Sequence, residues 1–271
     1  METSLTKKNS IHGFIVACVC VLTLTSCLTK NETNEQSLIV ERQECLLKHF
    51  THMTSEILPI TVVIDVPLDG PQTLRDSVTA FLNETLYAYF DNGEDRHVPY
   101  ENVFSNDVKQ LLEHYYKAYS NFFIADTTDT HEFETDCLVI SLVAQTDTYV
   151  TYEVNHILYG EGVETETEWV MFVKNDGHRL KKVISEHEML RFYRENPELR
   201  SEEVWENLLN QTYDEDSLSD VVCSVGLLED AVAHQYVYAP GIYEDSKYPL
   251  QAIAPYLSEE AQALIKHQIP K

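Results

Sequence analysis

The feature that most constrains this fold is a run of alternating residues between positions 149 and 173. Residues of similar character recur at every second position on both sides of Gly160-Glu161-Gly162, which is the period of a β-strand. Glycine adopts positive φ at little cost, so the chain can reverse there and pair the two strands as a hairpin. The first strand places Val150, Tyr152, Val154, His156 and Leu158 on one face, and Thr151, Glu153 and Asn155 on the other. The second places Thr165, Thr167, Trp169, Met171 and Val173 on one face, and Glu164, Glu166 and Glu168 opposite.

A second reversal at Asn175-Asp176-Gly177 extends this hairpin towards a three-strand meander. We expect the meander to have one wet, acidic face, because carboxylates recur on the polar positions of both strands. Like charges in neighbouring positions of a sheet repel each other, so such a row is there either for solubility or for a cationic partner. The candidate partner-binding face comprises Glu153, Glu161, Glu164, Glu166 and Glu168.

Amphipathic helices and further strands flank this meander. Residues 71–90 predict a helix with the apolar stripe Leu74, Val78, Phe81, Leu82 and Leu86. Other helices are expected from Ser105, over 186–193, from Ser201 and from Ser258, and other strands over 38–49, 57–66, 137–144, 221–228 and 231–238. Residues 239–241 are expected to open a loop that leads to a short helical segment near Leu250. The predicted fold class is α+β, an antiparallel sheet meander packed with amphipathic helices.

The N-terminal segment has the features of a targeting signal. Lys7 and Lys8 precede an apolar run at residues 11–25, and Leu24-Thr25-Ser26-Cys27 resembles the lipobox of bacterial lipoproteins. We therefore expect residues 1–26 to be a signal peptide, Cys27 to carry the lipid (palmitate among its acyl chains) and residues 27–37 to form a flexible tether. The alternative is an uncleaved transmembrane anchor, for which the run is barely long enough. The domain is then 38–271, either undivided or in two lobes, 38–130 and 131–271.

The charge of the chain limits its partners. The formal net charge is −26, so a nucleic acid is excluded as a partner, since binding one needs basic residues that neutralise phosphates. The acidic domain also has no means of holding anionic headgroups, which leaves the lipid to attach it to the membrane. The predicted location is the bacterial cell envelope, preferably the outer membrane, with the domain in the periplasm or at the cell surface.

Three cysteines remain after Cys27, namely Cys45, Cys137 and Cys223. An odd number does not form a disulfide framework, and we expect them to be small buried hydrophobic residues, with a single bridge left open.

No pattern in the sequence carries recognisable chemistry. The acidic stretch 126–136, which includes His131, lacks the glycine of a calcium loop, and His187-Glu188 is not followed by a second histidine at zinc-site spacing. Cys223-Ser224-Val225-Gly226 lacks the first glycine of a nucleophile elbow. His156 falls on an apolar face, where a hydrogen-bonded core histidine is expected. We therefore predict no metal, no cofactor and no named catalytic residue.

The order of these elements, together with Leu227-Leu228-Glu229-Asp230, Tyr236-Val237-Tyr238-Ala239-Pro240-Gly241 and Tyr248-Pro249-Leu250-Gln251-Ala252-Ile253, resembles the RsiV-like domain family over roughly residues 55–268. Domains of that family occur in envelope lipoproteins and in the extracellular part of lysozyme-sensing anti-sigma factors, and a related module is attached to some peptidoglycan deacetylases. Many members have a Gly-Gly-Ala-His-Gly turn where this chain has Tyr159-Gly160-Glu161-Gly162-Val163, so the role of the turn histidine does not transfer.

The sequence thus predicts a non-enzymatic binding domain for an envelope or extracellular protein, with a cationic protein or peptide as the partner to test. A hydrolase or deacetylase acting on the cell wall and a structural scaffold of an envelope complex remain as alternatives.

Overall fold

The computed structural model describes residues 37–50, 57–90, 110, 135–159, 163–202, 205–206, 222–239 and 242–269. All of them belong to one compact unit, Asn34–Lys271. Cys27, Glu161, the helix expected from Ser105 and most of the acidic stretch 126–136 lie outside the described residues.

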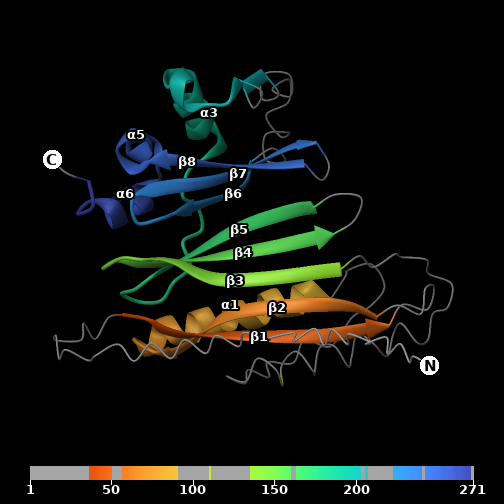
Figure 1. Ribbon diagram of the computed structural model, residues 1–271. Coiled ribbons are helices and arrows are strands. Elements are labelled where there is room, and N and C mark those ends of the chain that lie inside the picture. Colours follow the sequence, from red (N-terminus) through yellow and green to blue (C-terminus); the bar gives the residue numbers. More distant parts are fainter. Residues whose placement is uncertain are drawn as a thin grey trace, which may run out of the picture. The chain divides into compact units, whose positions relative to one another are not determined.

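A five-stranded sheet contains the predicted meander (Figure 1). Its strands lie in the order β1-β2-β3-β4-β5, and they comprise β1 (Ile39–Phe50), β2 (Ile57–Asp69), β3 (Thr135–Gln145), β4 (Tyr149–Tyr159) and β5 (Val163–Val173). The α+β fold class is confirmed, and the meander β3-β4-β5 is antiparallel, whereas β2 and β3 run parallel, so the whole sheet is mixed. Parallel neighbours need a long crossover, and here the crossover contains α1 (Gln72–Phe90). The sequence left open a division into two lobes at residue 130. Strands from both sides of that position, β1 and β2 before it and β3 to β5 after it, belong to this one sheet.

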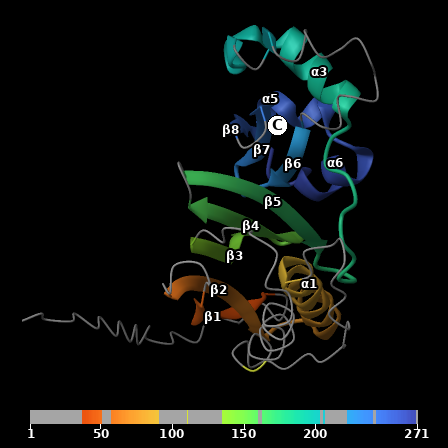
Figure 2. The same ribbon diagram turned by 90° about the vertical axis from the view of Figure 1, so that its right-hand side faces the viewer.

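Helix α1 packs on one face of this sheet (Figure 2). Its predicted apolar stripe is fully buried, and together with side chains from the sheet it forms what we call the helix-side core. The core members from the helix are Leu74, Val78, Phe81, Leu82 and Leu86, and those from the sheet include Val62, Ile64, Ile140, Val150, Tyr152, Val170 and Phe172.

The register between β4 and β5 corrects the predicted faces of the hairpin. Val154 lies directly opposite Glu168, and Tyr152 lies opposite Val170. Directly opposed residues of an antiparallel pair point to the same side of the sheet. The acidic row of β5 therefore shares the face of the helix-side core. Thr151, expected to be wet, is buried on the other face together with Thr167. The three-stranded part of the meander is β3-β4-β5, and residues 178–184 make only isolated bridges.

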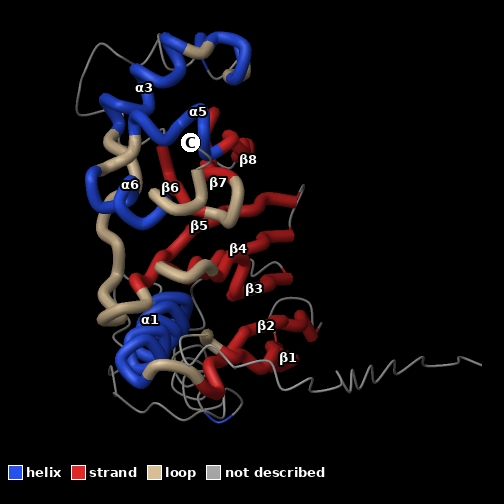
Figure 3. Tube along the Cα trace, turned by 90° about the vertical axis from the view of Figure 1, so that its left-hand side faces the viewer, coloured by secondary structure: helices blue, strands red, loops and turns tan. Residues whose placement is uncertain are grey.

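A second, three-stranded sheet follows, in the order β6-β7-β8. β6 (Val222–Leu227) and β7 (Ala231–Ala239) are the predicted hairpin. The sequence did not predict β8 (Ile242–Pro249), which lies between the expected loop at 239–241 and the helical segment near Leu250. The helices that pack with this sheet and whose bounds the structure describes are α3 (Glu186–Glu195), α5 (Leu250–Ile253) and α6 (Glu259–Ile265) (Figure 3). Short 3₁₀ turns occupy Pro197–Leu199 and Ala254–Tyr256. Ser258 caps α6 as predicted, with its hydroxyl accepting from the Ala261 N–H.

The apolar residues around the second sheet form what we call the second-sheet core. It includes Leu180, Met189, Phe192, Tyr193, Tyr236, Tyr248, Ile253 and Ile265, and it also takes in Tyr149 and Met171 from the first sheet.

Two of the three cysteines have described side chains. Cys45 and Cys137 are of intermediate exposure, so the expectation that they are buried is wrong. Cys45 nevertheless packs against the helix-side core.

Candidate functional site

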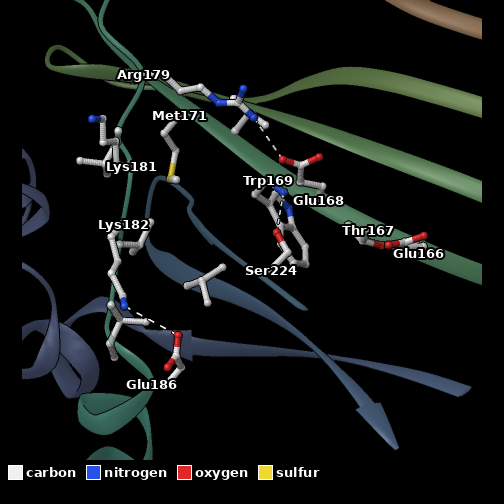
Figure 4. A pocket seen from close by; sticks show the side chains of 15 residues that line it. Glu166, Thr167, Glu168, Trp169, Met171, Arg179, Lys181, Lys182, Glu186 and Ser224 are labelled. Carbon is white, nitrogen blue, oxygen red and sulfur yellow. Dashed lines mark hydrogen bonds and ion pairs between the residues drawn. The ribbon is translucent and has the colours of Figure 1, made fainter. Parts of the chain in front are cut away.

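The candidate site is a cleft of about 740 Å³ along the outer edge of β5 (Figure 4). One wall is β5 from Glu166 to Met171, a second is the segment 179–186 and the third is formed by Ser224 and Val225 of β6. Its inner side is apolar, because Trp169, Met171 and Ile184 are buried there. The rim is charged, and it carries Glu166, Glu168, Arg179, Lys181, Lys182 and Glu186.

Gly226 allows the two sheets to approach at this place. A methyl group on Gly226 would lie 2.4 Å from the Cβ and Cγ atoms of Trp169, closer than atoms in contact can come. Only glycine therefore lets β6 lie against the indole. Gly226, which the sequence places two residues after Ser224, thus serves the packing of the second sheet against the first.

Side chains of the second sheet, in place of a further strand, satisfy the outer edge of β5. The amide of Gln235 accepts from the Thr167 N–H through Oε1 (2.8 Å) and donates to the Thr165 carbonyl through Nε2 (3.1 Å). The Ser224 hydroxyl accepts from the Trp169 N–H at 2.8 Å. An edge strand with unpaired backbone groups invites pairing with another chain, and these contacts remove that opportunity. The cleft is thus suited to side chains of a partner more than to an added strand.

The charges on the rim partly pair with each other. Arg179 Nη2 lies 3.2 Å from Glu168 Oε1, and Lys182 Nζ lies 3.7 Å from Glu186 Oε1. The Arg179 guanidinium also stands over the Phe81 ring, 5.4 Å from its centroid. Glu166 and Lys181 are exposed and make no ion pair with any residue that the structure describes. These two side chains are the charges most available to a partner.

The five acidic residues predicted to form one face do not all come together. Glu166 and Glu168 lie on the same face of β5, and the backbone register puts Glu164 in the same row. Glu153 lies on the other face, where its carboxylate accepts from the Trp169 Nε1–H (3.0 Å) and from the Asn155 side-chain amide (2.8 Å). A carboxylate held by two donors has a structural role, so the acidic surface is reduced to the β5 row.

Two of the residues considered for catalysis, Ser224 and His156, have structural roles. Ser224 caps the edge of β5, and His156 packs edge-on against Tyr89 with ring centroids 5.2 Å apart. Across the described part of the chain, no group of three His, Cys, Asp or Glu side chains gathers in a way that could hold a metal ion. The cluster around His131 lies outside that part. No helix in the described part of the chain has the length and apolarity needed to cross a membrane.

The buried His234 has no signal in the sequence beyond its place in a strand. Its Nδ1 lies 3.2 Å from the Tyr193 hydroxyl, while its Nε2 meets no hydrogen-bonding partner in the described structure. Burial alone lowers the pKa of His234 to about 3, so the imidazole is neutral at physiological pH. It has no access to the cleft, since it is completely buried.

Comparison with known proteins gives a likeness of fold. No profile of a known protein family matches the chain, and no curated protein matches it. Among solved structures, a member of the DUF3298 family from Bacteroides fragilis NCTC 9343 is 14% identical, with a TM-score of 0.47, over 85% of this chain and 98% of that one. A DUF3298 family protein from Pseudomonas aeruginosa PAO1 is 13% identical, with a TM-score of 0.48, over 83% of this chain and 98% of that one. The structural neighbours are thus distant bacterial DUF3298 proteins, and the RsiV-like relationship stays a prediction.

Proposed function

We propose that this protein is a lipid-anchored lipoprotein of the bacterial envelope whose domain binds a cationic protein or peptide at the rim of the β5 cleft. The observation that carries the proposal is the pair Glu166 and Glu168, two exposed carboxylates in one row on the edge strand of the sheet. The net charge of −26 would attract a basic partner from a distance, and this row would then contact it.

Arg179 is the local competitor for such a partner. Its side chain is 46% exposed and that of Glu168 is 55% exposed, so their ion pair is worth no more than about 1 kcal/mol. A lysine or arginine from a partner could replace Arg179 at Glu168 at small cost, while also pairing with Glu166. The rim thus has one carboxylate without an ion pair, that of Glu166, and a second, that of Glu168, whose ion pair with Arg179 is easily exchanged.

Binding is better supported than hydrolysis or deacetylation of the cell wall. Ser224, the serine whose sequence setting comes nearest to a nucleophile elbow, accepts a hydrogen bond from the Trp169 N–H, and the buried His234 does not reach the cleft. The role of scaffold in an envelope complex has no feature in its favour beyond those that also support binding.

Charge reversal tests the partner. We expect the double substitution Glu166→Lys and Glu168→Lys to lower the association rate of a basic protein such as lysozyme at least tenfold at low salt, with the difference shrinking as salt is raised. The control is Glu198→Lys with Glu206→Lys, which makes the same change in net charge at two exposed sites outside the cleft. Surface plasmon resonance would measure both rates. Equal rates for the two double variants would show that the β5 row is not the contact.

The anchor rests on the lipobox and has its own test. Cys27→Ala removes the thiol that would receive the lipid, so incorporation of an alkyne-labelled palmitate should stop and the unprocessed precursor should accumulate. Cys45→Ala is the matched control, because that cysteine lies in β1 of the folded domain. Mass spectrometry that finds a mature N-terminus at another residue would refute the assignment.

A further inference from the structure

A second cavity of about 460 Å³ shares no residue with the β5 cleft. Four segments far apart in the sequence line it: Pro71 before α1, Asp147 and Thr148 in the turn between β3 and β4, residues 173–175 at the end of β5, and Leu264 of α6. A smaller cavity of about 360 Å³ adjoins it through Asp147, Thr148 and Leu264, and adds Glu229 and His267 to the lining. Cavities of this size accommodate small molecules.

Lys174 is the unusual member of this lining. The residue is only 7% exposed, and its ammonium group makes no hydrogen bond or ion pair with any side chain that the structure describes. Lysine is rarely buried without a partner, because removing its charge from water is costly. Burial lowers the pKa of Lys174, and the charge of Asp147 opposes this effect. The Lys174 ammonium is therefore a partly desolvated cation that would gain from an anionic partner.

The backbone holds Lys174 firmly in this place. Its N–H donates to the Thr148 carbonyl at 2.8 Å, and the turn that follows is closed by a bond from the Gly177 N–H to the Val173 carbonyl, also at 2.8 Å. Gly177 has φ of +73°, and a methyl group there would lie 2.5 Å from the Thr73 carbonyl oxygen of α1. The turn is thus packed directly onto the helix, and the lysine is positioned before any ligand arrives.

Asp147 lines the same cavity without reaching Lys174. It is exposed, and its carboxylate forms no ion pair with the lysine, although it is close enough to influence the lysine pKa. The cavity therefore presents a cation and an anion that do not contact each other. A simple anion would be repelled by Asp147, by Glu229 and by the net charge of −26, whereas a simple cation would leave the Lys174 ammonium unpaired.

We propose that this cavity binds a small zwitterion, an amino carboxylate whose carboxylate pairs with Lys174 and whose ammonium group pairs with Asp147. A carboxylate is a better match than a phosphate, because the cavity offers one positive charge, that of Lys174, and a phosphate dianion would leave its second charge beside Asp147. This site does not depend on the function proposed for the β5 cleft, and a protein partner at that cleft would not need it.

The test uses amino acids whose ammonium and carboxylate groups are separated by carbon chains of increasing length. Isothermal titration calorimetry of the full chain with glycine, β-alanine, 4-aminobutyrate and 6-aminohexanoate should find at least one that binds with a stoichiometry of one. That compound should bind at least tenfold more tightly than the carboxylate or the amine of the same length, because each of those satisfies only one charge. O-phosphoethanolamine should bind more weakly than the best amino carboxylate.

Variants then assign the two contacts. Lys174→Met keeps most of the stem and removes the charge, and Asp147→Asn keeps the shape and removes the charge, so each should weaken binding at least tenfold. Lys181→Met is the matched control, since it removes an exposed lysine that lines the other cleft. For the wild-type protein, NMR should show the Thr148 and Asn175 amide signals moving on addition of the ligand. This measurement does not depend on whether any variant folds. No preference for any zwitterion over its single-charge analogues, unchanged binding in Asp147→Asn, tighter binding of O-phosphoethanolamine, or amide shifts confined to other residues would each overturn the proposal.

Discussion

The two cores of this domain are built from different chemistry. The helix-side core is made of aliphatic and aromatic groups from α1 and the first sheet, with Phe81, Tyr152 and Phe172 in mutual edge-on or tilted contact. The second-sheet core has a chain of hydroxyl groups at its centre. Tyr193 Oη lies 3.2 Å from Tyr248 Oη, which lies 2.9 Å from Tyr236 Oη.

This difference matters because a buried polar network depends on every member having a partner. Apolar packing loses stability in proportion to the volume removed, whereas an unsatisfied buried polar group costs its full desolvation. The tyrosine chain ends at His234, whose Nε2 has no hydrogen bond in the described structure. We therefore expect the stability of the second-sheet core to depend on pH, and the stability of the helix-side core to depend on the volume of its side chains.

The largest expected effect comes from removing volume beneath α1. Leu86 is fully buried in the helix-side core, so Leu86→Ala should lower the free energy of unfolding by about 3 kcal/mol. Chemical denaturation followed by circular dichroism would measure the change.

Leu46→Ala serves as the control, because Leu46 is 59% exposed and the same truncation there should cost less than about 0.5 kcal/mol. A loss at Leu86 no greater than that at Leu46 would mean that α1 does not pack as the structure has it.

The helix-side core is also the part that the sequence predicted well. The stripe of α1 recurs at helical spacing and the strands β4 and β5 alternate with period two, so their existence and ends follow from local pattern. The bounds of β4 are those expected from the sequence, Tyr149–Tyr159. What the pattern could not give is which faces of two strands coincide, since that depends on the register across the turn. The acidic row of β5 was therefore placed with Glu153, although the register puts them on opposite faces.

The second sheet was harder to predict for a different reason. β8 reads Ile242-Tyr-Glu-Asp-Ser-Lys-Tyr-Pro249, whose polar centre lacks the apolar alternation of a half-buried strand. It is a strand because β7 lies beside it and pairs with it from Ala231 to Ala239. The two cavities differ in the same way. Glu166 and Glu168 of the β5 cleft were found from their spacing, whereas Lys174 of the second cavity became notable only through burial by segments distant in sequence.

Acid should affect the second-sheet core by way of His234. The pKa of His234 is about 3 in the folded protein, against about 6.5 in an unfolded chain, so the unfolded state binds the proton more readily. Stability should therefore fall as pH decreases below about 6.5, by about 2 kcal/mol at pH 5 from this group. Denaturation of the wild type and of His234→Phe at pH 7 and pH 5 would isolate this contribution.

Tyr193→Phe is the matched control for the acid effect. It removes the hydroxyl next to His234 but keeps the imidazole, so it should lower stability at both pH values and retain the loss between them. If His234→Phe loses as much stability from pH 7 to pH 5 as the wild type, the buried imidazole is not the source.

The smallest expected effect involves His178, and its sign is opposite. This exposed histidine lies between Glu260 of α6 and Asp176 of the turn after β5, with Nε2 and Nδ1 each 2.5 Å from a carboxylate oxygen. The hydrogen bond to Glu260 raises the pKa of His178 most, and the one to Asp176 adds to it. A raised pKa means that the folded state binds the proton more tightly, so the link is complete below about 6.5 and is lost as pH rises through the raised value.

Glu260→Gln should therefore lower the NMR-measured pKa of His178 and slightly reduce the melting temperature at pH 6, with the difference from the wild type falling by pH 9 to that of Glu259→Gln. Glu259→Gln is the control, because it removes an equal charge from the same first turn of α6, where a carboxylate favours the helix, without touching the histidine. The effect should be small, since all three side chains are about half exposed and their charges are screened by water. If His178 titrates at or below 6.5 in the wild type, or if both glutamine variants behave alike, the contact between the turn and α6 does not depend on a charged histidine. Acid would then weaken the second-sheet core through His234 without any opposing gain from His178 at the surface.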